Sequence, residues 1–262
     1  MPSLERPTVS LHYEDTGAGQ PVVFLHGWCD SSATWAATMN EFARDYRCLA
    51  PDMRGHGRSG LPFDHAFTPE TLTNDLVAVC EAAGVQAPIL VGHSYGGYLA
   101  AETARRFPGF ARAVVVEDQQ LALRPFVEQM RSIEPVLRGR DSHMAFRRQW
   151  FETMVSPAMP AADRAVIEAA KEATPPDVAL GLWALMFEFT LDEISERADA
   201  LMAALGRQPS LSIESAPAPE YHAALAKLAP SARTAVITSG HWIHLEQPAA
   251  FRAAVRAFLG SL

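Results

Sequence analysis

Cysteine is scarce in this sequence, and its three cysteines, Cys29, Cys48 and Cys80, lie far apart. Their number is odd and the chain of 262 residues is not small, so we do not expect a framework of disulfide bonds. No Cys-x-x-Cys pair and no other metal-ligand spacing occurs. The sequence therefore gives no reason to expect a bound metal.

Long apolar runs are missing too. No run approaches the roughly 18 residues that a membrane-spanning helix needs. The first ten residues, MPSLERPTVS, lack the apolar stretch of a secretory signal. We therefore expect a cytoplasmic protein with no membrane partner.

Blocks of like charge are also absent. The net charge is -8, and acidic and basic residues are interspersed along the chain. Such a surface favours solubility and argues against nucleic acid as a partner. No nucleotide-binding loop is found, so we expect no cofactor. The expected partner is a small-molecule substrate, and the expected state is a monomer or small homo-oligomer.

Apolar strands and amphipathic helices alternate along most of the chain. The strands are predicted in PVVFL, APILV, ARAVVVE, SLSIE and RTAVI, and clear helical segments are TPETLTNDLVAVCEAAG and PAAFRAAVRAFLGSL. This rhythm is typical of parallel strands joined by helices, and it predicts a mainly parallel sheet covered on both faces.

The rhythm breaks in one long segment. Residues 122–207 contain several helical stretches, many prolines and no convincing strand. We interpret this segment as a helical cap inserted into a core formed by residues 1–121 and 208–262.

The segment VGHSYGG, residues 91–97, predicts a nucleophile. It fits the pattern Gly-x-Ser-x-Gly at Gly92, Ser94 and Gly96, directly between a predicted strand and a predicted helix. Such a turn is so sharp that the residues two before and two after the serine must be small. It exposes Ser94 and points the N–H of Tyr95 toward a developing oxyanion, and a second N–H is expected from Trp28.

A histidine follows the last predicted strand, in TSGHWIHLEQP. His241 comes directly after Gly240 at the carboxyl edge of the sheet, where it can reach Ser94. His244 is the competing candidate, three residues further on. For the other histidines near these motifs we expect structural roles: His26, His56 and His93.

The carboxylate that should orient this histidine is not where the fold usually has it. The loop after SLSIE reads SAPAPEY and offers only Glu214, within the strand, and Glu220, beyond two prolines. Asp118 ends the preceding strand and points to the opposite side from Glu117, because side chains alternate along a strand. We predict that Asp118 is the partner of His241. Its alternative role is to cap, by hydrogen bonding, the start of the segment that follows it. Assistance from Glu214 or Glu220 stays open.

The motifs FLHGW, DMRGHGRS, GHSYGG and GHWIHLEQP resemble the α/β-hydrolase family over the whole chain outside the proposed cap. Three features resemble the cofactor-independent 3-hydroxy-4-quinolone 2,4-dioxygenases of that fold: the segment HGWC, the acid at the end of the strand VVVED, and the segment ESAPAPEY. Tyr95 and Asp30 depart from that family, which has histidine at both positions.

The narrower resemblance implies a dioxygenase that needs no cofactor. Its substrates would be O2 and a small aromatic heterocycle, a 2-alkyl-3-hydroxy-4-quinolone, cleaved to carbon monoxide and an N-acylanthranilate. His241, supported by Asp118, would be the base, and Ser94 would position the substrate. The alternative is a serine hydrolase of the carboxylesterase type, in which Ser94 is the nucleophile. A non-catalytic ligand-binding protein is disfavoured because Ser94, Asp118 and His241 are all present.

The proposed cap offers pocket residues for either activity. In LGLWALMFEFTLDEI, Trp183 and Phe187 share one predicted helical face with Met186 and Thr190, and suit a flat or alkyl-bearing substrate. The alternative is plain packing of cap on core. Cys29 is expected to be buried and unreactive, since no base is spaced to activate it.

Overall fold

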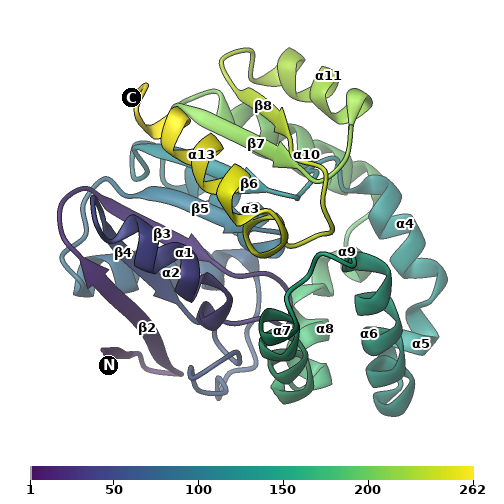
Figure 1. Cartoon of the computed structure of the whole chain (residues 1–262). Coiled ribbons are helices and arrows are strands. Elements are labelled where there is room, and N and C mark those ends of the chain that lie inside the picture. The colour runs from purple at the N-terminus through teal and green to yellow at the C-terminus, as the bar shows by residue number, and fades with distance from the viewer. Residues whose placement is uncertain (1) are drawn as a thin grey trace.

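The protein is described by a computed structural model that covers residues 2–262. Its centre is a sheet with the strand order β1-β2-β4-β3-β5-β6-β7-β8 (Figure 1). The strands are β1 (Ser3–Glu5), β2 (Ser10–Gly17), β3 (Pro21–Leu25), β4 (Arg47–Pro51), β5 (Ile89–His93), β6 (Ala113–Glu117), β7 (Ser210–Glu214) and β8 (Arg233–Val236). The predicted strands are all present.

The direction of the strands brings the chemistry to one edge. β1 and β2 are antiparallel, whereas β4, β3, β5, β6, β7 and β8 run parallel to one another. Loops that follow parallel strands all leave from the same edge of the sheet, and ligands bind there in open α/β folds. The turns after β5, β6 and β8 therefore meet.

Helices cover both faces of the sheet, as expected from the alternation of apolar segments. One face packs on the 3₁₀ turn η1 (Ser32–Trp35), α1 (Ala36–Phe42), α12 (Ile243–Glu246) and α13 (Pro248–Leu259). The other packs on α2 (Pro69–Ala82), α3 (Tyr95–Arg106), α10 (Leu191–Leu205) and α11 (Pro219–Leu228). In β5, Leu90 faces the second group and Val91 the first, so both sides of the strand are buried.

The segment between β6 and β7 is helical. It contains α4 (Arg124–Ser132), α5 (Glu134–Arg138), α6 (Arg140–Met154), α7 (Ala161–Ala173), α8 (Pro176–Leu182), α9 (Ala184–Glu188) and α10. Helices α5 to α8 lie beyond the sheet, at the lower right of Figure 1. We propose that residues 122–207 form a cap on the core. Within this segment, Leu201 and Met202 of α10 are buried in the core beside α3.

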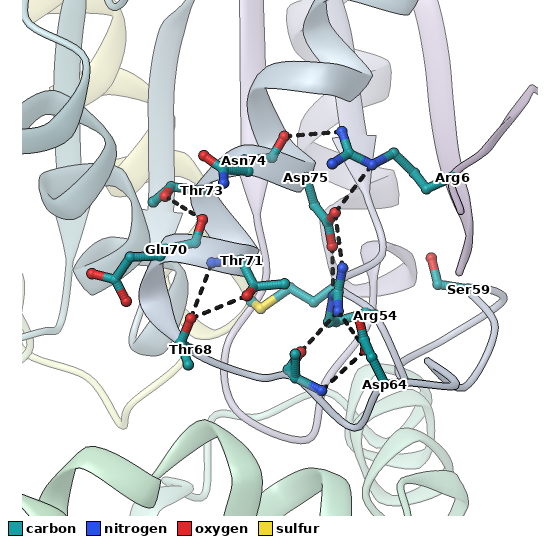
Figure 2. A network of polar contacts seen from close by, with 12 residues as sticks. Arg6, Arg54, Ser59, Asp64, Thr68, Glu70, Thr71, Thr73, Asn74 and Asp75 are labelled. Carbon is teal, nitrogen blue, oxygen red and sulfur yellow. Dashed lines mark hydrogen bonds and ion pairs between the residues drawn. The ribbon is translucent and has the colours of Figure 1, made fainter. Parts of the chain in front are cut away.

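A buried ion pair fixes the loop that follows β4. The Arg54 guanidinium donates to both carboxylate oxygens of Asp75 on α2, over 2.7 and 3.0 Å, and to the Ala66 carbonyl over 2.8 Å (Figure 2). Arg6 approaches the same carboxylate from the N-terminal segment at 3.6 Å. Bidentate geometry gives such a pair its strength. Arg54 thus holds the loop, which agrees with a structural role.

No helix in residues 2–262 is long and apolar enough to cross a membrane.

Candidate active site

Ser94 occupies a strained turn between β5 and α3. Its backbone has φ 52° and ψ -122°, a combination that residues other than glycine rarely adopt. A Cβ atom on Gly92 would lie 2.2 Å from the Gly96 carbonyl oxygen, and one on Gly96 would lie 2.2 Å from that of Leu25. Both glycines are therefore required for the close approach, as the motif predicts.

Asp118 contacts the histidine that follows β8. Its Oδ2 lies 2.6 Å from Nδ1 of His241. This hydrogen bond selects the tautomer with the proton on Nδ1 and leaves Nε2 free to act as a base. Burial raises the pKa of Asp118, but the hydrogen bonds from His241 and Ser215 outweigh it, and the net pKa is lowered. The carboxylate stays ionised opposite the imidazole.

The loop after β7, which usually supplies the acid in this fold, has a different role here. The backbone N–H of Ser215 donates to the other oxygen of Asp118, Oδ1, over 2.7 Å. The Asp118 N–H in turn donates to the Ile213 carbonyl on β7 over 2.7 Å. Asp118 has a φ of 46°, so β7 holds it in a left-handed conformation. The loop orients the acid that β6 supplies.

His241 is held by its backbone as well as by Asp118. Its N–H donates to the Met154 carbonyl at the end of α6 over 2.7 Å. Its carbonyl accepts from Nε2 of His93 over 3.0 Å. Burial, with help from nearby His241 and His244, lowers the pKa of His93 well below its ordinary value, so this imidazole is neutral. His93 therefore positions the histidine loop, a role that goes beyond packing.

Ser94 and His241 line one cavity, although no hydrogen bond joins their side chains within residues 2–262. Such bonds are often long in ligand-free enzymes and tighten when substrate is bound. Trp28 and Tyr95 also line this cavity, and the backbone amide of neither residue donates to an acceptor in the described chain. They are available to an oxyanion on a carbon bonded to Ser94.

The competing histidine has another partner. Nδ1 of His244 lies 2.8 Å from Oε1 of Glu117, both side chains are fully buried, and the His244 ring stacks on Trp35. Glu117 and Asp118 thus bind one histidine each from opposite sides of the strand end. His26 is also structural, because its Nε2 accepts from the Met53 amide over 2.9 Å.

The Glu214 side chain makes no hydrogen bond with His241 in residues 2–262. Its Oε1 accepts from the Ser212 hydroxyl over 2.9 Å, and that hydroxyl lies 3.3 Å from the Tyr221 hydroxyl. Burial, and to a lesser extent the Asp118 charge, raise the pKa of Glu214 to about 7. Glu220 is exposed at the start of α11.

The cavity is lined mainly by aromatic and aliphatic side chains, which suit an apolar part of a ligand. One wall is aromatic: Trp28 and Trp183 stack with ring centroids 4.1 Å apart and planes 8° apart, and Trp150 packs against both. The Trp28 indole N–H donates to the Ala179 carbonyl of α8 over 2.9 Å, which fixes this ring.

The prediction for Phe187 needs correction. The chain does not form one helix here, since α8 ends at Leu182, α9 begins at Ala184, and Thr190 starts α10. Because the helix is interrupted at Trp183, Phe187 does not line the cavity. Its ring packs under the Arg138 guanidinium instead. Trp183 and Met186 do line the cavity.

Cys29 is fully buried, and burial raises the pKa of its thiol to about 11, so it is unreactive at neutral pH. Within residues 2–262, no three His, Cys, Asp or Glu side chains gather as metal ligands would.

Sequence reasoning missed Lys171, which lies on α7 and lines the cavity while only 4% exposed. A signal existed, because Lys171 follows the buried Ile167 by four residues and so shares its helical face. A single lysine on such a face is easily taken for part of a solvated surface.

Relatives among curated proteins match over less than half of the chain. An epoxide hydrolase of Caballeronia sordidicola is 43% identical over 108 residues, which are 40% of this chain and 33% of that protein. The bifunctional esterase/perhydrolase DCH of Acinetobacter calcoaceticus is 40% identical over 113 residues, 41% of either protein. The chain thus spans between a third and two fifths of these relatives' own lengths. Neither is a quinolone dioxygenase, and they give the narrower resemblance no support.

Solved structures match over nearly the full length. A hydrolase from Pseudomonas aeruginosa superposes with a TM-score of 0.82 at 24% identity, over 99% of this chain and 98% of that one. The enol-lactonase from Burkholderia xenovorans LB400 gives a TM-score of 0.76 at 19% identity, over 99% and 100%. The sequence also matches the alpha/beta hydrolase family over residues 22–254. By sequence and by fold, this chain belongs to the alpha/beta hydrolase family.

Proposed function

We propose that the protein is a serine hydrolase that cleaves a carboxylic ester or lactone. The observation that carries the proposal is the 2.6 Å contact of Asp118 with His241, in a cavity that also exposes Ser94 on its strained turn. A serine becomes a nucleophile only when a base takes its proton, and the base works only in the correct tautomer. The arrangement supports both conditions.

In the acylation step, Oγ of Ser94 attacks the carbonyl carbon while Nε2 of His241 accepts the serine proton. The tetrahedral oxyanion accepts hydrogen bonds from the Trp28 and Tyr95 amides, and Asp118 stabilises the imidazolium. When the carbonyl re-forms, the bond to the leaving oxygen breaks and His241 returns the proton to that oxygen. From an ester the alcohol departs, and from a lactone it stays attached to the acyl chain; in both cases an acyl group remains on Ser94.

In the deacylation step, His241 removes a proton from water and the resulting nucleophile attacks the acyl carbon. The same two amides bind the second oxyanion. The bond to Oγ breaks, Ser94 regains its proton from His241, and a carboxylic acid leaves. No further co-reactant is needed.

The relationship to an epoxide hydrolase does not extend to epoxide opening by Ser94. Attack of a serine on an epoxide carbon would form an ether, which has no carbonyl for water to attack. The enzyme would stop after one turnover. A carboxylate nucleophile avoids this problem, because the intermediate is then an ester. Serine at position 94 therefore favours acyl transfer.

A second candidate function rests on one observation, the position of the catalytic acid. The acid partner of His241 is Asp118, which follows β6, and the loop after β7 supplies no acid to His241. In the quinolone dioxygenase alternative, His241 takes the proton of the substrate 3-hydroxyl, and the electron-rich anion reacts with O2. Carbon monoxide and an N-acylanthranilate leave. Ser94 then only positions the substrate.

Comparing the two activities in matched variants separates the candidates. The purified enzyme is assayed for hydrolysis of aryl esters and for oxygen uptake with a 2-alkyl-3-hydroxy-4-quinolone, as wild type, Ser94→Ala and His241→Ala. The hydrolase predicts ester turnover that both variants abolish, without oxygen uptake. Oxygen uptake that is lost in His241→Ala and only reduced in Ser94→Ala would favour the dioxygenase.

A further inference from the structure

The chain contains two lysines, and they lie in opposite environments. Lys227 is exposed on α11, whereas Lys171 on α7 is 4% exposed and lines the cavity with Ser94 and His241. A buried ammonium loses its hydration and is costly unless a partner compensates it. Its presence in this cavity requires an explanation.

Aromatic rings surround the Lys171 ammonium. Its Nζ lies 5.5 Å from the ring centroid of Trp28, 5.7 Å from that of Phe151 and 5.4 Å from that of Trp242. No hydrogen bond or ion pair joins this ammonium to another group of residues 2–262. Ring faces replace part of the lost hydration, but no group of the described residues accepts a hydrogen bond from the ammonium.

The surrounding charges leave an excess of positive charge. Arg147 is 1% exposed, its Cζ lies 5.6 Å from the Trp28 ring centroid, and its Nε and Nη2 have no partner in the described chain. Against these two cations stands the Asp30 carboxylate, which accepts from the Ser31 amide over 2.7 Å and from the Trp242 indole over 3.1 Å. The Glu172 carboxylate also acts on Arg147, but it is paired with Arg148 over 2.6 Å. Cys29 contributes no charge, since its thiol is protonated at neutral pH.

The Lys171 ammonium packs against the rings of two residues that belong to or adjoin the proposed catalytic groups. Trp28 supplies an oxyanion amide and Trp242 follows His241 directly, and both rings contact Lys171. A group bound by Lys171 would therefore belong to the part of the substrate close to the reacting carbonyl. The stacked rings of Trp28 and Trp183 suit a flat neighbour in the same space.

From this arrangement we propose that Lys171 recognises a carboxylate on the substrate, so that the preferred substrates are esters or lactones that carry a second, ionised carboxylate. The inference rests on the proposed function for the reaction, but the binding of the carboxylate stands independently of turnover. A carboxylate accepts from the free donors of the ammonium and cancels the excess charge of this wall. Lys171 is then a specificity-determining residue.

A pair of esters with one leaving group tests the kinetic consequence. Mono-p-nitrophenyl glutarate carries the carboxylate, and p-nitrophenyl butyrate lacks it. Lys171→Met should lower kcat/KM for the glutarate ester by about 10- to 100-fold, the range for hydrogen bonds to charged groups, chiefly through KM. The butyrate ester should change by less than about threefold, and Lys227→Met should affect neither ester. An equal loss on both esters would overturn the proposal.

Calorimetric titration with 3-phenylpropanoate and 3-phenylpropanamide tests binding without turnover. Wild type should bind the carboxylate about 10-fold more tightly than the amide or better, and Lys171→Met should abolish the difference. Equal affinity for the two ligands in wild type, or a difference that survives in Lys171→Met, refutes the assignment. If neither ester is hydrolysed while the carboxylate preference holds, the proposed reaction fails and Lys171 keeps its role. Lys171→Gln replaces Lys171→Met if the latter does not fold, which thermal unfolding shows.

Discussion

The carboxylate of Asp118 and the imidazole of His241 are 2.6 Å apart, although 123 positions separate them in the chain. One follows β6 and the other follows β8, and the intervening strand β7 with its loop supports Asp118 through the Ile213 carbonyl and the Ser215 amide. The acid has moved inward by one strand, and the loop SAPAP has become its support. The order Ser94, Asp118, His241 along the chain is unchanged.

Replacing Asp118 by Asn should lower kcat for ester hydrolysis by about 10³- to 10⁴-fold with little change in KM. The amide no longer favours the Nδ1–H tautomer of His241 and cannot stabilise the imidazolium, while Oδ1 can still accept from Ser215. Steady-state kinetics measures the loss, and circular dichroism checks the fold. Glu220→Gln is the matched control at the exposed rival acid and should retain full activity. A comparable loss in Glu220→Gln would contradict the role of Asp118.

Glu214 should make stability fall as pH rises. Its pKa is raised from an ordinary value of 4.5 to about 7, so between these values the folded state holds the proton more tightly than the unfolded state. This contribution is complete below the unfolded pKa and is lost as pH rises through the folded pKa. Glu214→Gln should therefore match wild type in acid and be more stable at alkaline pH, by at most about 3 kcal/mol. Urea unfolding across this pH range measures the difference, and parallel profiles for the two proteins would argue against a protonated Glu214.

Arg54 should matter for stability and little for chemistry. Arg54→Met leaves the Asp75 carboxylate buried with only Arg6 nearby, and breaking such a pair costs about 3–5 kcal/mol. The double variant Arg54→Met/Asp75→Leu removes both charges and should recover part of this loss. Denaturant unfolding measures the free energies. A large fall in kcat for folded Arg54→Met, at a temperature well below its unfolding, would place Arg54 in the chemistry instead.

Trp183 should select for aromatic acyl groups. Trp183→Leu removes an aromatic ring that lines the cavity, and the pairing of a bound aryl group with such a ring contributes about 0.5–1.5 kcal/mol beyond its buried area. We expect kcat/KM for an aryl-acyl ester to fall about 3- to 10-fold, and that for an acetyl ester to stay nearly constant. Phe187→Leu, outside the cavity, is the control. Equal losses on both esters would indicate a general disturbance of the cavity.

Much of the fold follows from the sequence because local patterns determine it. The strands were predictable from continuous apolar runs such as AVVVE, and the turn at Ser94 from Gly92 and Gly96, which no larger residue can replace. Asp118 was predictable from the alternation of side chains, since it takes the opposite side from Glu117. These features depend on residues a few positions apart.

The parts that were missed depend on contacts between distant segments. The donation from Ser215 to Asp118 and that from His93 to the His241 carbonyl join separate loops, and no periodicity reports them. Phe187 was misplaced because the chain breaks at Trp183 where a helical pattern continues. Lys171 was not predicted to be buried, because the residues that surround it, Trp28, Phe151 and Trp242, come from distant segments of the chain.

The most direct test of the account is to trap the acyl-enzyme. Rapid mixing with an excess of a p-nitrophenyl ester, followed by acid quenching and mass spectrometry, should show a burst of p-nitrophenol and the acyl mass on the peptide that contains Ser94. Asp118→Asn should slow the burst, and Ser94→Ala should show neither burst nor adduct. Ester turnover that persists in Ser94→Ala, or an acyl group on another residue, would contradict the assignment of Ser94 as the nucleophile.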